Sequence, residues 1–349
     1  MKPLKIALLL LFCLAAWQLP AEAAAGAFRV YLVFSYSPGM WDEQGRRGVE
    51  LALRNQNITD FETKVYNYNY VEKRKYRTEE LKKITAEIAG FRPDLIIVFD
   101  DEASEDLIPD LNRLDIPIVA TGINRELKDL SWFKPEGAAD RNFTGVLERY
   151  PFEQPLKFLK KINPEISEIT ILTSENVSSS VIVEQFIRQF RKSGGASSGI
   201  RLKEVIKSRD WERWQAAIRS HRGVNEAFWI LVPWDVYGKD GKEVPLNEIG
   251  EFYQRESRIP ELGIVNANHM IGLLACFSVN SEDLGYQAAA AGIQAIKNKR
   301  SLSRVPFAKV ETVRLIINKK RADTLHYKIP IGFLEFAEIE KKIPLSYLR

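Results

Sequence analysis

The stretch Asp-Leu-Ile-Ile-Val-Phe-Asp-Asp-Glu, residues 94–102, decides the fold class of this chain. Its apolar run is short and nearly continuous, which is typical of a strand buried on both faces of a parallel sheet. Three carboxylates follow directly. Ligands bind outside the carboxyl ends of such strands, so the stretch predicts an α/β fold with binding groups in the post-strand loops.

Similar patterns alternate on both sides of this stretch. Short apolar runs predict strands, and amphipathic stretches with polar caps predict helices. In the first part of the chain we expect strands over 28–34, 61–68, 94–99 and 116–120, and helices over 42–55, 78–90 and 104–114. A second series has expected strands over 169–173, 201–206, 227–232, 273–277 and 311–317, and helices over 151–162, 180–191, 210–218 and 281–297.

This alternation predicts two doubly wound, Rossmann-like lobes with parallel sheets, and the length of 349 residues suits two domains. We expect lobe 1 to comprise residues 28–140 and 272–304, and lobe 2 to comprise 141–271 and 305–349. The chain then crosses between lobes more than once. Several crossing segments form a multi-strand hinge.

The N-terminus has the features of an export signal. Lys2 and Lys5 precede the apolar run 6–16, and Ala21-Glu22-Ala23 fits the small-residue rule for a cleavage site. We therefore expect a signal peptide over 1–23, cleavage near Ala23/Ala24, and a periplasmic or secreted protein. No apolar run approaches the roughly 20 residues that span a bilayer, so a membrane-spanning protein is not expected.

Composition excludes several classes of function. The 50 basic and 46 acidic residues nearly balance and the basic ones are dispersed, so no nucleic-acid partner is expected. His221, His269 and His326 form no ligand pattern with Cys276, and no metal site is expected. No nucleotide-binding or hydrolase motif is present, so we expect no cofactor and no catalytic residue.

Two loops of the first lobe stand out as binding candidates. The loop after the first strand carries Tyr36, Ser37 and Trp41, and an aromatic side chain there can stack on a ligand. Asp101 and Glu102 follow the strand at 94–99. Either carboxylate can accept from an amine or hydroxyl, or can serve only to cap the next helix.

Two further groups complete the candidate site. Thr121 and Asn124 of the first lobe are expected to face Ser174 and Ser179 of the second, where hydroxyls bind a ligand or cap a helix. Trp234 and Asp235 follow the strand at 227–232 and suit a ligand with an apolar face and a cationic or hydroxyl group.

Several motifs in collinear order resemble a known family. They are Asn142-Phe143-Thr144-Gly145-Val146, Pro151-Phe152-Glu153, Gly272-Leu273-Leu274-Ala275-Cys276-Phe277-Ser278, Leu284-Gly285-Tyr286-Gln287-Ala288-Ala289, and Leu315-Ile316-Ile317-Asn318 with Ile329-Pro330. Together they resemble the ABC transporter substrate-binding proteins of the tryptophan/tyrosine-binding type. The N-terminal motifs at 35–41 and 93–101 are similar to variants found as sensor ectodomains.

The resemblance implies a type I periplasmic-binding-protein fold, with ligand between the lobes and closure on binding. It implies a small polar or aromatic, amino-acid-like ligand, and it adds Phe277 to the candidate residues because the family has an aromatic residue there. The implied partners are ABC permease and ATPase subunits, encoded separately. Two alternatives stay open: a sensing module for a membrane kinase or cyclase, and a periplasmic enzyme that uses the carboxylates at 100–102.

Overall fold

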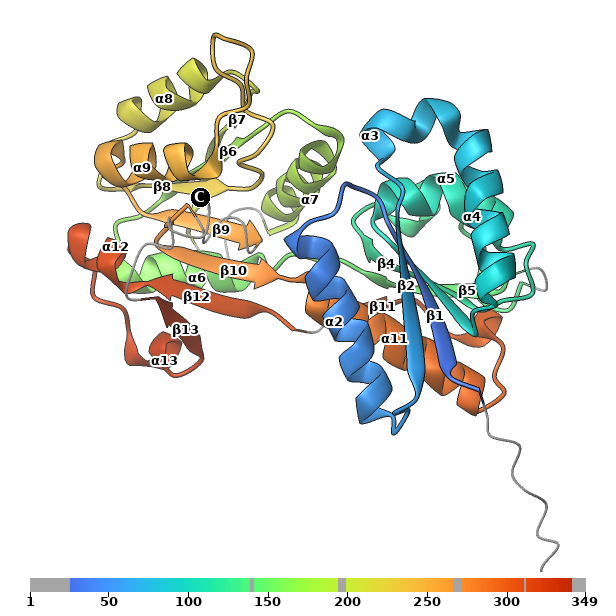
Figure 1. Ribbon diagram of the computed structural model, residues 1–349. Helices are drawn as coiled ribbons and strands as arrows, with labels where there is room; N and C mark the ends of the chain where they lie inside the picture. The colour runs from blue at the N-terminus through green and yellow to red at the C-terminus, as the bar shows by residue number, and fades with distance from the viewer. Residues whose placement is uncertain (1–25, 139–140, 194–198, 266–270, 311, 341–349) are drawn as a thin grey trace, which may run out of the picture.

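The computed structural model describes residues 26–138, 141–193, 199–265, 271–310 and 312–340. They form two α/β lobes, each built on its own sheet (Figure 1). The expected signal peptide lies outside the described residues. Within the ranges described, no helix is both long and apolar enough to span a bilayer.

The first sheet has six strands, all parallel, in the order β11-β5-β4-β3-β1-β2. Central strands such as β3 are buried along their whole length, as their continuous apolar sequence predicts. The strands are β1 (Phe28–Phe34), β2 (Phe61–Asn67), β3 (Leu95–Phe99), β4 (Ile118–Ile123), β5 (Phe143–Leu147) and β11 (Ala308–Lys309). The helices of this lobe are α2 (Met40–Asn55), α3 (Tyr70–Lys73), α4 (Arg77–Phe91), α5 (Asp101–Leu111) and α11 (Ser281–Lys297), with short 3-10 turns η1 (Arg74–Tyr76), η2 (Leu127–Asp129) and η3 (Leu302–Arg304).

The second sheet has seven strands in the order β13-β12-β10-β9-β8-β6-β7. Its pairings are parallel except that β12 runs antiparallel to β10. The strands are β6 (Glu168–Thr173), β7 (Arg201–Lys207), β8 (Glu226–Ile230), β9 (Glu261–Val265), β10 (Ala275–Val279), β12 (Arg314–Asn318) and β13 (Ala337–Glu340). The helices are α6 (Glu153–Ile162), α7 (Val177–Ser193), α8 (Trp211–Ser220), α9 (Leu246–Glu256), α12 (Lys319–Thr324) and α13 (Ile331–Leu334).

In the part of the chain that the structure describes, three crossings join the sheets: one at 148–152, one at Asn280 and one between β11 and β12. The expected boundaries at 141, 272 and 305 are therefore wrong for three strands: they assign β5, β10 and β11 to the other lobe from the one in whose sheet each strand pairs. Among the described residues between β4 and β5, only the 3-10 turn η2 is helical, so no β-α-β pattern marks β5. β10 and α11 look like one unit in sequence, but the chain changes lobe at Asn280 between them.

Close helix packing holds α11 in the first lobe. A Cβ built on Gly48 of α2 lies 1.9 Å from the carbonyl oxygen of Glu282, and one on Gly285 lies 2.3 Å from that of Gly45. Only glycine permits the two backbones to approach so closely. Asn280 caps α11 by accepting from the Asp283 N–H at 2.9 Å. The expected helix over 281–297 thus forms, but in the lobe opposite β10.

Candidate functional site

The strand order reverses at equivalent places in the two sheets. In the first sheet, β1 lies between β2 and β3; in the second, β6 lies between β7 and β8. A ligand of a doubly wound sheet binds at this reversal, outside the carboxyl ends of the strands. The loops after β1 and β3, and those after β6 and β8, are therefore the first places to look for binding groups.

Asp100 occupies the reversal point of the first lobe, directly after β3. Its backbone has φ 71° and ψ 162°, a conformation that residues other than glycine rarely adopt. The Trp41 indole Nε1 donates to Asp100 Oδ1 at 3.1 Å. Asp100 is only 8% exposed, and its Oδ2 has no hydrogen-bond partner among the described residues. A strained, buried carboxylate with one free oxygen is a candidate ligand acceptor.

Asp101 and Glu102 form the first turn of α5, so the helix expected to begin at Ser104 begins three residues earlier. Asp101 accepts from the backbone N–H groups of Asn124 at 3.0 Å and Arg125 at 3.1 Å. Glu102 is buried and hydrogen-bonds with Tyr36. Carboxylates in a first turn stabilise the positive helix end, which explains the earlier start.

Glu148, which the sequence interpretation missed, lies at the end of the first crossing beside this group. The Tyr150 hydroxyl donates to Glu148 Oε1 at 2.6 Å, and Asn124 Nδ2 donates to Oε2 at 3.0 Å. Asn124 Oδ1 is buried without a partner among the described residues. No signal in the sequence marks Glu148, because it directly follows β5, a strand that was not expected. We call Asp100, Asp101, Glu102 and Glu148 the acid cluster.

Burial dominates the electrostatics of the acid cluster. It raises the pKa of Asp101 to about 7 and of Glu148 to about 7, and raises the pKa of Asp100 well above its usual range. Neighbouring carboxylates raise these pKa values further. Arg125 and Arg149 oppose the shift, but they do not outweigh burial. A bound cation would relieve this repulsion.

The second lobe brings a different set of groups to its reversal point. Asn176 Nδ2 donates to Asp235 Oδ2 at 2.9 Å and to Ser174 Oγ at 3.3 Å. Its Oδ1 accepts from the Ser179 N–H at 2.8 Å. Ser174, Ser179 and Asp235 therefore meet around Asn176, a residue that the sequence interpretation did not select. Trp234 is half-buried against the core of this lobe.

Three of the expected site residues are fully accounted for by contacts within the protein. Ser37 donates to Asn69 Oδ1 at 3.2 Å on the surface. Thr121 donates to the Leu284 carbonyl at 3.2 Å and ties β4 to α11. Phe277 is 3% exposed and packs edge-on against Phe158, with ring centroids 5.8 Å apart. The family-based expectation for Phe277 overlooked this core packing.

The lobes touch each other beside the acid cluster. Gln185 of α7 donates through Nε2 to the Asn124 carbonyl. Arg188 lies about one turn further along α7, and its Nη2 is 3.4 Å from Glu126 Oε1. Figure 1 shows α7 on the side of the second lobe that faces the first. These contacts place α7 next to the loop that follows β4.

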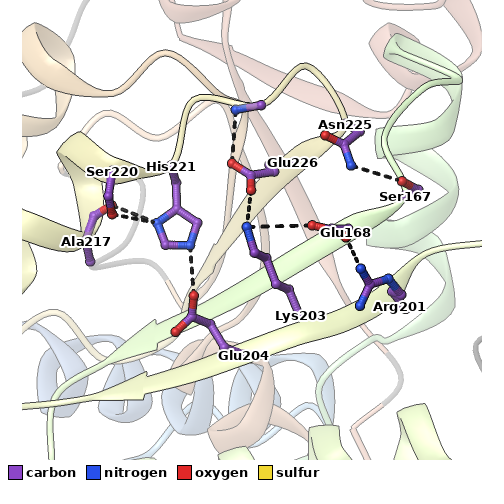
Figure 2. Close-up of polar contacts among 11 residues, drawn as sticks. Ser167, Glu168, Arg201, Lys203, Glu204, Ala217, Ser220, His221, Asn225 and Glu226 are labelled. Atoms are coloured by element: carbon purple, nitrogen blue, oxygen red, sulfur yellow. Dashed lines mark hydrogen bonds and ion pairs between the residues drawn. The ribbon is translucent and has the colours of Figure 1, made fainter.

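Charges at the opposite end of the second sheet are paired. Figure 2 shows Lys203 between Glu168 and Glu226, with Arg201 on the other side of Glu168. His221 lies nearby, with Nε2 3.1 Å from Glu204. These residues sit toward the amino ends of β6, β7 and β8, away from the candidate binding loops. Over the ranges described, no group of three or more His, Cys, Asp or Glu side chains is arranged to hold a metal.

Comparison with known proteins gives a consistent picture. The sequence model of the family described as "ABC transporter substrate binding protein" matches residues 33–338. A tyrosine-binding protein of Clostridioides difficile (strain R20291) is 26% identical over 219 residues, which cover 60% of this chain and 56% of that protein. The aligned part thus spans little more than half of the relative.

Solved structures share the fold. An ABC domain from Streptococcus pneumonia in complex with L-Trp has a TM-score of 0.61 at 18% identity, over 89% of this chain and 99% of that one. A ligand-free, open substrate-binding protein with adhesive properties from Clostridium difficile has a TM-score of 0.67 at 17% identity, over 90% and 100%. An arabinose-binding protein from Geobacillus stearothermophilus has a TM-score of 0.57 at 10% identity, over 86% and 99%. The two lobes thus have the type I periplasmic-binding-protein fold.

Proposed function

This chain belongs to the ABC transporter substrate-binding protein family, and from that premise we propose that it binds a small amino-acid-like molecule through a cationic amine. The family consists of non-enzymatic binding proteins. The observation that carries the proposal is the buried Asp100 Oδ2, which lacks a hydrogen-bond partner in the described structure. An ammonium group supplies a hydrogen bond and a positive charge, which together stabilise the ionised form of Asp100 that burial otherwise disfavours.

The surroundings of Asp100 favour a cation over a neutral ligand. Asp100 is surrounded by the other three acidic side chains of the acid cluster, and burial penalises each added negative charge. A charge-assisted hydrogen bond is about twice as strong as a neutral one. Trp41 donates to Asp100 Oδ1 and Tyr36 hydrogen-bonds with Glu102, so two aromatic side chains lie next to the proposed ammonium position. An amine with an aromatic side chain suits both features.

The second lobe supplies neutral polar groups for the rest of the ligand. Ser174, Asn176 and Asp235 gather at its reversal point, the counterpart of the Asp100 position. A ligand held by both lobes stabilises the conformation in which both reach it. The three crossings are the segments about which we propose that the lobes close, as hinges formed by few residues do in two-lobed binding proteins.

The proposed partners follow from the family. An ABC substrate-binding protein delivers its ligand to separately encoded permease and ATPase subunits. We propose that residues 1–23 direct export and are removed, so that the mature protein works outside the cytoplasm. Radiolabelled uptake in cells with and without this gene tests the transport role, and unchanged uptake of the ligand would favour a sensing module instead.

A ligand screen tests the binding proposal. The chain from residue 26 is screened by thermal shift against L-tyrosine, L-tryptophan, aromatic amines, sugars and dicarboxylates. An amine at about 100 times its Kd adds about 2.7 kcal/mol to the free energy of unfolding. Asp100→Asn then weakens binding of that amine about 100-fold in calorimetric titration, because the charge-assisted bond is lost.

A matched control separates this effect from general loss of charge. Asp60→Asn removes one carboxylate from an exposed turn of the same lobe and leaves the affinity unchanged. Hits restricted to sugars or dicarboxylates, or an Asp100→Asn protein that binds the amine as tightly as the wild type, would refute the proposal.

A further inference from the structure

A pocket lies where the two lobes and the first crossing meet. Its volume is about 370 Å³, within the range of small-molecule sites. Its walls come from the loop after β4, the crossing after β5, the middle of α7 and the edge strand β11. The residues that matter for its chemistry are Glu126, Lys128, Arg149, Gln185, Arg188 and Lys309.

This pocket, which we call the basic pocket, has an excess of positive charge. Four of its lining side chains are cationic and Glu126 is the one carboxylate among the lining residues. Glu126 is shared, since it lies 3.4 Å from Arg188 and 3.9 Å from Arg149. Among the described residues, neither Lys128 nor Lys309 has a carboxylate within ion-pair distance. One lining carboxylate therefore faces four cations from both lobes, and of these cations only Arg188 has a further carboxylate beside it among the described residues, Glu184 at 3.9 Å.

Arg149 is a rigid part of the wall. Its Nη1 donates to the carbonyl oxygens of Ile123 at 2.9 Å and Glu148 at 2.7 Å, and its Nη2 donates to that of Arg125 at 3.1 Å. Carbonyl oxygens satisfy the N–H groups but leave the net charge in place. Holding this cation costs little further entropy when a ligand binds, because its side chain is already ordered.

We propose that the basic pocket binds a small polyanion that carries carboxylate or phosphate groups and that bridges the two lobes. Lys128 and Lys309 from the first lobe and Arg188 from the second converge on it, with Arg149 fixed between them. A polyanion compensates a charge that Glu126 only partly neutralises. The volume is far larger than one water or a bare ion needs, so it suits a molecule with two or more anionic groups.

This site differs from the amine site in charge, and the two adjoin where Glu148 of the acid cluster precedes Arg149 of the basic pocket. The acid cluster lies after β3 and at the end of β5 and attracts cations, whereas the basic pocket lies toward β11 and attracts anions. An anion that contacts both α7 and the loop after β4 stabilises the arrangement of the lobes seen in this structure, because it binds this arrangement more tightly than others. The inference does not depend on the amine proposal.

Calorimetric titration at low ionic strength tests it, with citrate as the carboxylate probe and inorganic pyrophosphate as the phosphate probe. At least one probe binds with one-to-one stoichiometry, and added salt weakens the affinity because charges dominate. Lys128→Gln/Lys309→Gln weakens binding at least about tenfold, and Arg188→Gln weakens it to a similar degree. The probe that binds more tightly identifies the anionic group.

The control removes the same charge elsewhere. Lys82→Gln/Lys320→Gln replaces one exposed lysine in each lobe and leaves the affinity within about twofold of the wild type. Asp100→Asn does not weaken anion binding, which separates this site from the amine site. Absence of saturable binding of both probes, or equal weakening in both double variants, would overturn the proposal; an unaffected Arg188→Gln protein would refute the bridging.

Discussion

The two lobes place an aspartate at equivalent points of the same topology and then treat it differently. Asp100 follows β3 and Asp235 follows β8, and both have left-handed φ angles, 71° and 59°. Asp235 accepts from Asn176 at 2.9 Å, whereas Asp100 Oδ2 is buried without a partner in the described structure. Topology thus sets where a binding group lies, and its neighbours set what it can bind.

The lobes also differ in how they treat buried charge in general. In the second lobe, Arg321 and Glu261 are both fully buried and form an ion pair. In the first, no Lys or Arg among the described residues forms an ion pair with the acid cluster. The second lobe uses this buried pair for structure, and we infer that the first lobe keeps the acid cluster for a ligand.

The largest expected effect concerns the paired charge. Arg321→Met leaves Glu261 buried without its cation and lowers the free energy of unfolding by about 3–5 kcal/mol. Urea denaturation measures this loss. Arg321→Met/Glu261→Leu removes both charges and recovers most of the stability, since a hydrophobic pair of similar size is often neutral. A loss below about 1 kcal/mol in the single variant would mean that this pair is not structurally important.

The next effect is a pH dependence of stability, and it comes from buried carboxyl groups that have no ion-pair partner in the described structure. The folded-state pKa values of Asp101 and Glu148 are about 7 and that of Asp42 is about 6, all above their unfolded values. The native state therefore holds more protons than the unfolded state between pH 4 and 7, and stability falls as pH rises through this window. For Glu148 alone the loss is on the order of 3 kcal/mol, since its pKa is raised from 4.5 to about 7.

Thermal unfolding of the ligand-free protein at pH 5, 6, 7 and 8 measures this decline. Glu148→Gln makes the decline with pH less steep, because the variant has one fewer carboxyl group with a raised pKa. Glu165→Gln, in an exposed turn of the second lobe, leaves the decline unchanged. Identical slopes in the wild type and Glu148→Gln would show that burial of the acid cluster does not govern its titration.

The smallest expected effect is on ligand affinity, and it compares the equivalent aspartates Asp100 and Asp235. Asp235→Asn weakens binding of the amine by about tenfold or less, because Asn176 already partners this carboxylate. Asp100→Asn costs about 100-fold in the same titration. Equal losses in the two variants would mean that the lobes share the charge recognition, and a reversed order would move the amine site to the second lobe.

The sequence allowed much of the fold to be predicted, because local patterns determine it. β1 and α11 begin and end at the expected residues, and Asp210 caps α8 by accepting from the Glu212 N–H at 2.9 Å, as its position indicated. The assignment of β5 and β10 to sheets could not be read, since strand pairing depends on residues distant in the chain.

The sequence predicted where the candidate site lies, but it predicted only some of the residues that form it. The loops after β1, β3, β6 and β8 were expected, yet Asp101 and Glu102 were selected and Asp100 was not. Which carboxylate of three neighbours lacks a partner depends on the fold, because the Asn124 and Arg125 N–H groups that bind Asp101 come from the loop after β4. Glu148 joins the cluster only through the tertiary structure.

One titration tests the central claim most directly. The amine found in the screen and its desamino analogue, such as L-tryptophan and indole-3-propionate, are titrated into the wild type and Asp100→Asn. If the free oxygen of Asp100 binds the ammonium, the desamino analogue binds the wild type about 100-fold more weakly, and the difference largely disappears in Asp100→Asn. A desamino analogue that binds the wild type as tightly as the amine would contradict the account.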